Sequence, residues 1–121
     1  MRARTLTAAT VVLFVRASLG CGPDASGSCP QDLPDQCPSA VPSFKTDVEP
    51  IFERRCWHCH ANGGPEAASH NFSTYDNIYA QRSAILNQVY ACHMPPAGQT
   101  PPTSDERAKL LAWLVCKAPN N

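Results

Sequence analysis

The segment from Ser43 to His60 reads SFKTDVEPIFERRCWHCH, and it decides how the rest of the chain is interpreted. Thr46 and Glu49 have the spacing of a capping box, in which two side chains close the first turn of a helix. Apolar residues then follow at helical spacing: Val48, Ile51 and Phe52. Because this period is typical of a helix with one buried face, the segment predicts a helix over about 46–57.

The predicted helix runs directly into Cys56-Trp57-His58-Cys59-His60, which contains Cys-x-x-Cys-His. That spacing is the attachment signature of a c-type haem. Two thiols about one helical turn apart can each bond a vinyl group on one edge of the porphyrin, and the adjacent imidazole then points at the iron. The motif therefore predicts that Cys56 and Cys59 hold one haem covalently and that His60 is an axial ligand.

The same two cysteines also fit a redox dithiol or half of a zinc site. A Cys-x-x-Cys pair also occurs in redox dithiols, but the surrounding sequence has no βαβ pattern. Half of a zinc site is the other alternative, with Cys92 and His93 as the remaining ligands, although a second ligand pair at good spacing is missing. Haem attachment is the interpretation that the neighbouring sequence favours.

The rest of the chain also predicts helices and loops. Residues 61–72 contain Gly-Gly-Pro and read as a loop. A second helix is expected over about 74–91, with a break near Gln81, because apolar side chains recur there at helical spacing. Thr103-Ser104-Asp105-Glu106 is a second capping box that starts a last helix over about 104–116. With no strand pattern of useful length, the sequence predicts an all-α fold.

A proline-rich stretch between the last two helices supplies a candidate for the other side of the iron. Met94 is followed by Pro95 and Pro96 and lies 34 residues after His60. A methionine on a stiff, non-helical loop can bring its thioether to the metal. His93 is the alternative ligand, and since neighbouring residues on an extended chain point apart, only one of the two should face the iron.

The first 42 residues do not resemble domain material. A basic start and the apolar stretch Leu6–Val15 predict a signal peptide over residues 1–20, because that stretch is too short to span a bilayer. Cys21 then becomes a candidate for lipid modification. The Pro-, Ser- and Gly-rich residues 21–42 predict a tether, and residues 43–121 the folded domain. The protein is expected to be exported, and to be periplasmic or membrane-anchored through its lipid.

Four of the seven cysteines remain after these assignments, and four cysteines allow three pairings. Cys29 and Cys37 are close in sequence and could close a small loop. Cys92 and Cys116 flank the methionine stretch and the last helix. A disulfide between Cys92 and Cys116 would tie the methionine stretch to the last helix, so the sequence predicts this pair. The second predicted disulfide is then Cys29–Cys37. Free thiols are not expected outside the cytoplasm.

Three segments resemble those of small bacterial c-type cytochromes: SFKTDVEPIFERRCWHCH, the later Met94-Pro95-Pro96 and the closing SDERAKLLAWL. The resemblance covers about residues 43–118. It implies the small all-α cytochrome c fold, with three to four helices around one haem c. It also implies that the first and last helices cross and that Met94 reaches the iron from its loop.

The expected function is electron transfer by an iron that cycles between Fe(III) and Fe(II), with His60 and Met94 bound in both states. The protein is then an electron carrier for other redox proteins, and not an enzyme. The alternative is a haem enzyme or a sensor of gases or peroxide that uses a labile sixth ligand. Without residues 1–20 the chain has seven basic and ten acidic residues, a balance of −3, which does not favour nucleic-acid binding.

Overall fold

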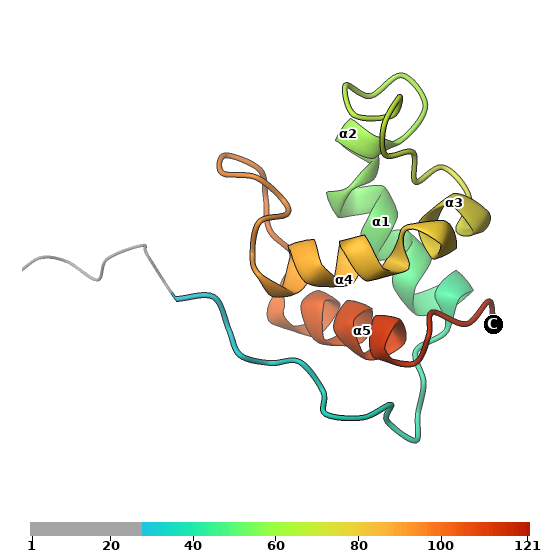
Figure 1. Cartoon of the computed structure of the whole chain (residues 1–121), viewed down its shortest axis with the longest axis vertical. Helices are drawn as coiled ribbons and strands as arrows, with labels where there is room; N and C mark the ends of the chain where they lie inside the picture. Colours follow the sequence, from blue (N-terminus) through green and yellow to red (C-terminus); the bar gives the residue numbers. More distant parts are fainter. Residues whose placement is uncertain (1–27) are drawn as a thin grey trace, which may run out of the picture.

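The computed structural model describes residues 28–121, and over that range it is all-α, which confirms the predicted fold class (Figure 1). The predicted signal peptide and Cys21 lie outside the described residues. The elements are a short π-helix, η1 (Phe44–Val48), and the α-helices α1 (Glu49–Arg55), α2 (Trp57–His60), α3 (Tyr75–Ala80), α4 (Arg82–Tyr90) and α5 (Ser104–Val115). There are more helices than the three to four expected, because two of the predicted helices are divided.

The first helical segment begins earlier than its predicted capping box. Ser43 is the residue that caps η1: its hydroxyl accepts a hydrogen bond from the N–H of Thr46, and its own N–H donates to the Asp47 carboxylate at 2.9 Å. Thr46 and Glu49 therefore lie inside the helical segment and do not form the expected box. The serine one turn earlier satisfies the free backbone donors that a helix start leaves.

The other two helix boundaries agree with the sequence. The helix predicted over 74–91 is broken at Gln81, which ends α3 and precedes α4. The capping box at the start of α5 is present. The Thr103 hydroxyl accepts from the Glu106 N–H, and the Glu106 carboxylate accepts from the Thr103 N–H at 2.9 Å. These caps fix where α5 starts, and so fix which of its faces is buried.

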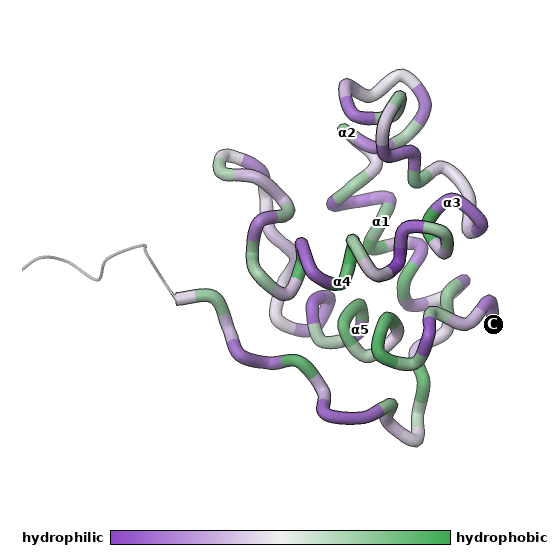
Figure 2. The backbone as a smooth tube through the Cα atoms, in the orientation of Figure 1, coloured by the Kyte–Doolittle hydropathy of each residue, from purple (hydrophilic) through white to green (hydrophobic). Residues whose placement is uncertain are grey.

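Trp113 on α5 lies at the centre of the core and is fully buried. Its ring centroid is 5.5 Å from that of Phe44 and 6.5 Å from that of Phe52, so the last helix packs against the first helical segment. Figure 2 shows that α5 is largely apolar, whereas polar and apolar residues alternate along α4. The remaining core residues are Val48, Phe72, Ile78, Ile85, Val89, Leu110, Leu111, Leu114 and Ala118. Burial of this apolar surface is the main term that stabilises the fold.

Residues 28–42 form an N-terminal strap that is bonded to the helical domain, so this part of the predicted tether is not a free linker (Figure 1). Disulfides join Cys29 to Cys92 and Cys37 to Cys116. The predicted pairs Cys29–Cys37 and Cys92–Cys116 are therefore wrong. Each bridge crosses a large part of the chain, because the strap runs past both the end of α4 and the end of α5.

The two disulfides indicate a protein of an oxidising compartment, because such bridges do not persist in the reducing cytosol. This agrees with the expectation of export. Among residues 28–121, none of the helices combines the length and the apolar character that a membrane crossing requires.

Candidate functional site: an apolar cleft beside the Cys-x-x-Cys-His segment

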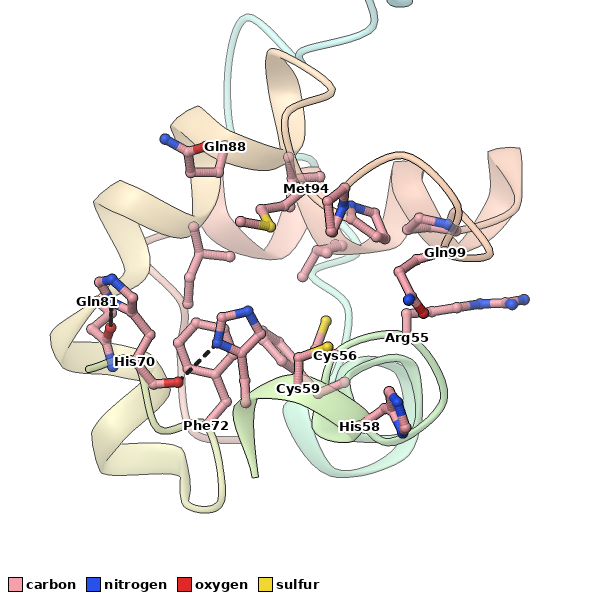
Figure 3. Close-up of a pocket in the computed structure, with 18 of the residues that line it drawn as sticks. Arg55, Cys56, His58, Cys59, His70, Phe72, Gln81, Gln88, Met94 and Gln99 are labelled. Atoms are coloured by element: carbon pink, nitrogen blue, oxygen red, sulfur yellow. Dashed lines mark hydrogen bonds between the residues drawn. The ribbon is translucent and has the colours of Figure 1, made fainter. Parts of the chain in front are cut away.

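A cleft of about 330 Å³ opens between α1 and α2 on one side and α4 on the other, with the loop after α4 closing its far edge (Figure 3). Most of its lining is apolar. Figure 3 shows that the cysteines and the methionine named in the sequence reach it from different elements. The residues that line the cleft include Phe52, Cys56, Cys59, His60, His70, Phe72, Gln81, Ile85, Val89, Met94 and Leu110.

Cys56 and Cys59 are the two free cysteines among the six that the structure describes. Both line the cleft, since Cys56 follows the last turn of α1 and Cys59 lies in α2. Burial, together with the smaller effect of the neighbouring Cys59, raises the pKa of the Cys56 thiol to about 12. Reactive dithiols have lowered pKa values, so this environment disfavours a redox dithiol.

His60 presents one ring nitrogen to the cleft and uses the other for a hydrogen bond. Its Nδ1 lies 2.9 Å from the carbonyl oxygen of His70. Because a carbonyl can only accept, Nδ1 carries the proton and Nε2 keeps its free lone pair. The ring also stacks on Phe72, with centroids 4.5 Å apart and planes 20° apart. The imidazole is thus held in the tautomer and orientation that a metal ligand needs.

Residues 61–72, here called the histidine loop, fold tightly against α2. The Phe72 N–H donates to the His60 carbonyl at 2.7 Å, and the Trp57 indole donates to the Phe72 carbonyl at 2.9 Å. Gly64 approaches the backbone of Cys59 so closely that a Cβ at this position would lie 2.3 Å from the Cys59 oxygen. Only glycine fits there without a backbone shift. The loop therefore fixes the segment that carries Cys59 and His60.

Met94 enters the cleft from the loop after α4, whereas Cys56 and Cys59 lie on the other side of the cleft (Figure 3). It lies in residues 91–103, here called the methionine loop, and its N–H and that of His93 both donate to the Gln88 carbonyl, at 3.1 and 2.9 Å. Met94 lines the cleft, whereas His93 does not. Of the two candidates for the second side, the geometry favours Met94. Its side chain is 37% exposed, so it lies at the mouth of the cleft.

Arg107 anchors the base of the methionine loop. Its guanidinium donates to the last carbonyls of α4, at 2.6 Å to Val89 and 3.1 Å to Tyr90. It also forms a two-point ion pair with Asp32 of the strap, at 2.7 and 2.9 Å, and these hydrogen bonds lower the pKa of the Asp32 carboxyl. The Cys29–Cys92 bridge lies beside it, two residues before Met94. The Arg107 side chain thus joins the strap to the end of α4 and to the base of the methionine loop.

A second ion cluster lies behind the cysteine side of the cleft. Glu106 accepts hydrogen bonds from Arg54 at 3.1 Å and from Arg55 at 2.8 Å, and so ties the end of α1 to the start of α5. Burial alone would raise the pKa of Glu106. The hydrogen bonds from the Thr103 N–H and the two guanidinium groups outweigh burial and hold that pKa at about 2.

The sequence did not identify Phe72, Gln81 and Arg107 as parts of this site. Phe72 and Gln81 carry no motif, and their roles depend on a loop that folds back over α2. Arg107 follows the capping box of α5, where a basic residue ordinarily indicates a solvated helix face. Its burial and its pairing with Asp32 require the strap, which the composition of residues 21–42 had described as a tether.

Comparisons with protein-family models, with curated proteins and with solved structures found no match to this chain. The inferred membership of the bacterial cytochrome c family is therefore not supported and is withdrawn, together with the lipoprotein assignment that accompanied it. The resemblance is confined to short sequence segments, and no protein family or known fold was found that shares them with this chain.

The expectation of a metal-binding group also needs correction. Within residues 28–121, no three His, Cys, Asp or Glu side chains are grouped so that they could hold a metal ion. Cys92 is in a disulfide with Cys29, so it cannot complete a zinc site with the free cysteines. The described residues therefore do not show the three protein ligands that a tetrahedral zinc centre needs.

Proposed function

We propose that this chain holds one haem covalently in the cleft and acts as a single-electron carrier outside the cytoplasm. One observation carries the proposal: two free thiols, an imidazole with an available Nε2 and a thioether face the same apolar cleft. The other four described cysteines are paired in disulfides. In a compartment that oxidises thiols, a free pair one helical turn apart is best explained by another covalent use.

The residues present fit the demands of this group. Cys56 and Cys59 would hold it through thioether bonds, and His60 Nε2 and the Met94 thioether would be the ligands that the protein supplies to the iron. When bound, haem supplies an iron that takes up and releases one electron. A haem iron takes four ligands from its own ring, so it requires only two from the protein.

The surrounding side chains have supporting tasks. Ile85, Val89 and Leu110 supply apolar walls that exclude water from the cleft. The hydrogen bond from His60 Nδ1 to the His70 carbonyl selects the tautomer with its proton on Nδ1, in which Nε2 has the lone pair that binds a metal. Since His60 lies on α2, which the histidine loop holds, and Met94 lies on an anchored loop, little rearrangement would be needed during electron transfer. Other redox proteins would be the donors and acceptors.

A second candidate function follows from the exposure of Met94. Its side chain lies at the cleft mouth and is 37% exposed, so displacement by a small molecule would open one position on the iron. The chain would then act as a sensor of gases or peroxide, or as a haem enzyme. Both candidates use the same cysteines and His60, and they differ only in whether Met94 stays bound.

The test is to produce the full chain together with a haem-attachment system in an oxidising compartment. The proposal expects haem that remains on the protein after denaturation, a pyridine-haemochrome spectrum of two thioether bonds, and its loss in Cys56→Ser with Cys59→Ser. Protein that carries no covalent haem would refute it.

The ligand on the second side is tested by a matched pair of variants. Met94→Ala should abolish the long-wavelength absorption band of methionine–iron bonding, while His93→Ala, one residue away, should retain it. Carbon monoxide distinguishes the two candidate functions. No binding to the reduced wild type supports the electron carrier, and rapid binding supports the sensor or enzyme.

A further inference from the structure

Gln81 occupies the break between α3 and α4, on the wall of the cleft that faces the histidine loop (Figure 3). It ends one helix and precedes the next, with φ −104° and ψ 6°. A break in a helix leaves backbone groups without intrahelical partners, so the chain at Gln81 needs a compensating interaction. The Gln81 side chain provides one by bonding to the histidine loop.

The Gln81 amide is bonded at both of its ends. Its Oε1 lies 2.9 Å from Nδ1 of His70, and its Nε2 donates to the carbonyl of Asn71 at 3.3 Å. The same Nε2 donates to the carbonyl of Asn77, also at 3.3 Å, which fixes the amide to its own helix. Gln81 therefore holds the side chain of His70 and the backbone of Asn71 from the opposite wall, and so confines the stretch of backbone between them.

That piece of backbone is the one that orients His60. The His70 carbonyl accepts the hydrogen bond from His60 Nδ1 at 2.9 Å. A chain of contacts thus leads from Gln81, through His70 and Asn71, to the imidazole. Gln81 has no direct hydrogen bond to His60, so any effect on that ring acts through the loop.

We propose that Gln81 is a positioning residue for His60, and that its two-ended amide keeps the His70 carbonyl where it selects the Nδ1–H tautomer. The role of this tautomer in metal binding rests on the proposed function. The tautomer itself does not, because it is a property of the chain before any group is bound. Partners of this kind ordinarily change metal affinity or activity about 10- to 100-fold.

The chain offers a matched control. Gln88 is the same residue type, lies on α4 and also lines the cleft, but its side chain has no hydrogen bond within the described residues. Gln81→Leu removes both ends of the bridge. Gln81→Glu keeps an acceptor for His70 and loses the donor to Asn71, so it tests whether the donor end is needed.

The measurement is made on the purified full chain with its two disulfides. If the thiols are free, nitrogen NMR of the imidazoles gives the tautomer ratio of His60. We expect Gln81→Leu to lower the ratio of the Nδ1–H form to the Nε2–H form by up to about tenfold, which is the effect of losing one hydrogen bond. Gln81→Glu should have an intermediate effect, and Gln88→Leu none. If haem is attached, the readout is solvent exchange of the His60 Nδ1 proton, which should speed up in the same order.

A His60 tautomer ratio or exchange rate in Gln81→Leu that equals that of Gln88→Leu would overturn the proposal. Circular dichroism checks that each variant folds. If Gln81→Leu does not fold, the same His60 measurement on Gln81→Glu, with Gln88→Glu as its control, tests the proposal instead. Failure of haem attachment in the wild type refutes the proposed function alone, because the tautomer comparison is still made on the chain with free thiols.

Discussion

The Glu106 cluster allows a quantitative test of what holds the cysteine side of the cleft in place. The pKa of this carboxyl is about 2 in the folded chain, against an ordinary value of 4.5. This difference corresponds to about 3 kcal/mol of stability when the carboxyl is ionised. The Glu106 side chain is only 11% exposed, but that of its partner Arg54 is 54% exposed, so water and salt screen part of the interaction. We expect about 2 kcal/mol at pH 7.

Glu106→Gln removes the charge and keeps an oxygen that can accept from the Thr103 N–H. The free energy of unfolding should therefore fall by about 2 kcal/mol at pH 7, mainly through loss of the anion that Arg54 and Arg55 share. Glu53→Gln is the control. Glu53 is exposed on α1 and has no ion pair within the described residues, so its loss should change stability by less than about 0.5 kcal/mol.

The pH dependence has a definite sign. Because the folded pKa is below the unfolded one, the contribution of Glu106 is fully present above pH 4.5 and is lost as the pH falls through about 2. Roughly two fifths of it should remain at pH 3. Urea unfolding of the disulfide-intact chain at pH 7 and pH 3, followed by tryptophan fluorescence, gives both numbers. A variant as stable as the wild type at pH 7, or a deficit that does not shrink at pH 3, would refute this account.

Two further predictions concern the loops and the strap. Gly64→Ala should destabilise the fold by about 2 kcal/mol, because its Cβ would lie 2.3 Å from the Cys59 oxygen and the backbone must shift; thermal unfolding measures this, and an unchanged midpoint would contradict the close approach. Cys37→Ser with Cys116→Ser opens a loop of 79 residues and should cost up to about 4 kcal/mol in the chain-entropy model. Urea midpoints test this loss, and equal midpoints would show that the Cys37–Cys116 bridge contributes nothing to stability.

Local signals predicted the helices well because they depend on neighbouring residues. The capping box at Thr103 and the break at Gln81 both involve side chains within one turn of the backbone groups that they affect. The start of the first helical segment was misplaced for the same reason. Ser43 and Thr46 can each cap a helix, and the choice depends on Asp47, whose carboxylate accepts from the Ser43 N–H. Two local patterns competed, and sequence spacing alone did not rank them.

Tertiary relations were predicted poorly because they depend on where distant segments meet. Cys29 and Cys37 are close in sequence, yet they bond to cysteines 63 and 79 residues away. Proline-rich composition showed that residues 28–42 have no core of their own, which is correct. It did not show that this segment would pack on a core formed by other residues. For the site, the motif gave Cys56, Cys59 and His60, but not the loop that orients the imidazole.

The two walls of the cleft are reinforced in different ways. On the His60 side, the bonds run through an exposed network of amides and backbone carbonyls, with Gln81 at its far end. On the Met94 side, the loop is fixed by a disulfide and by a buried guanidinium paired with Asp32. Under the proposed function, the Met94 thioether would be the weaker ligand and lies on an exposed loop, so this side would benefit more from covalent anchoring. The His60 imidazole would bind more strongly and would need chiefly the correct tautomer, which hydrogen bonds can select. The strap is thus part of the site, since without it neither Arg107 nor Cys92 would have its partner.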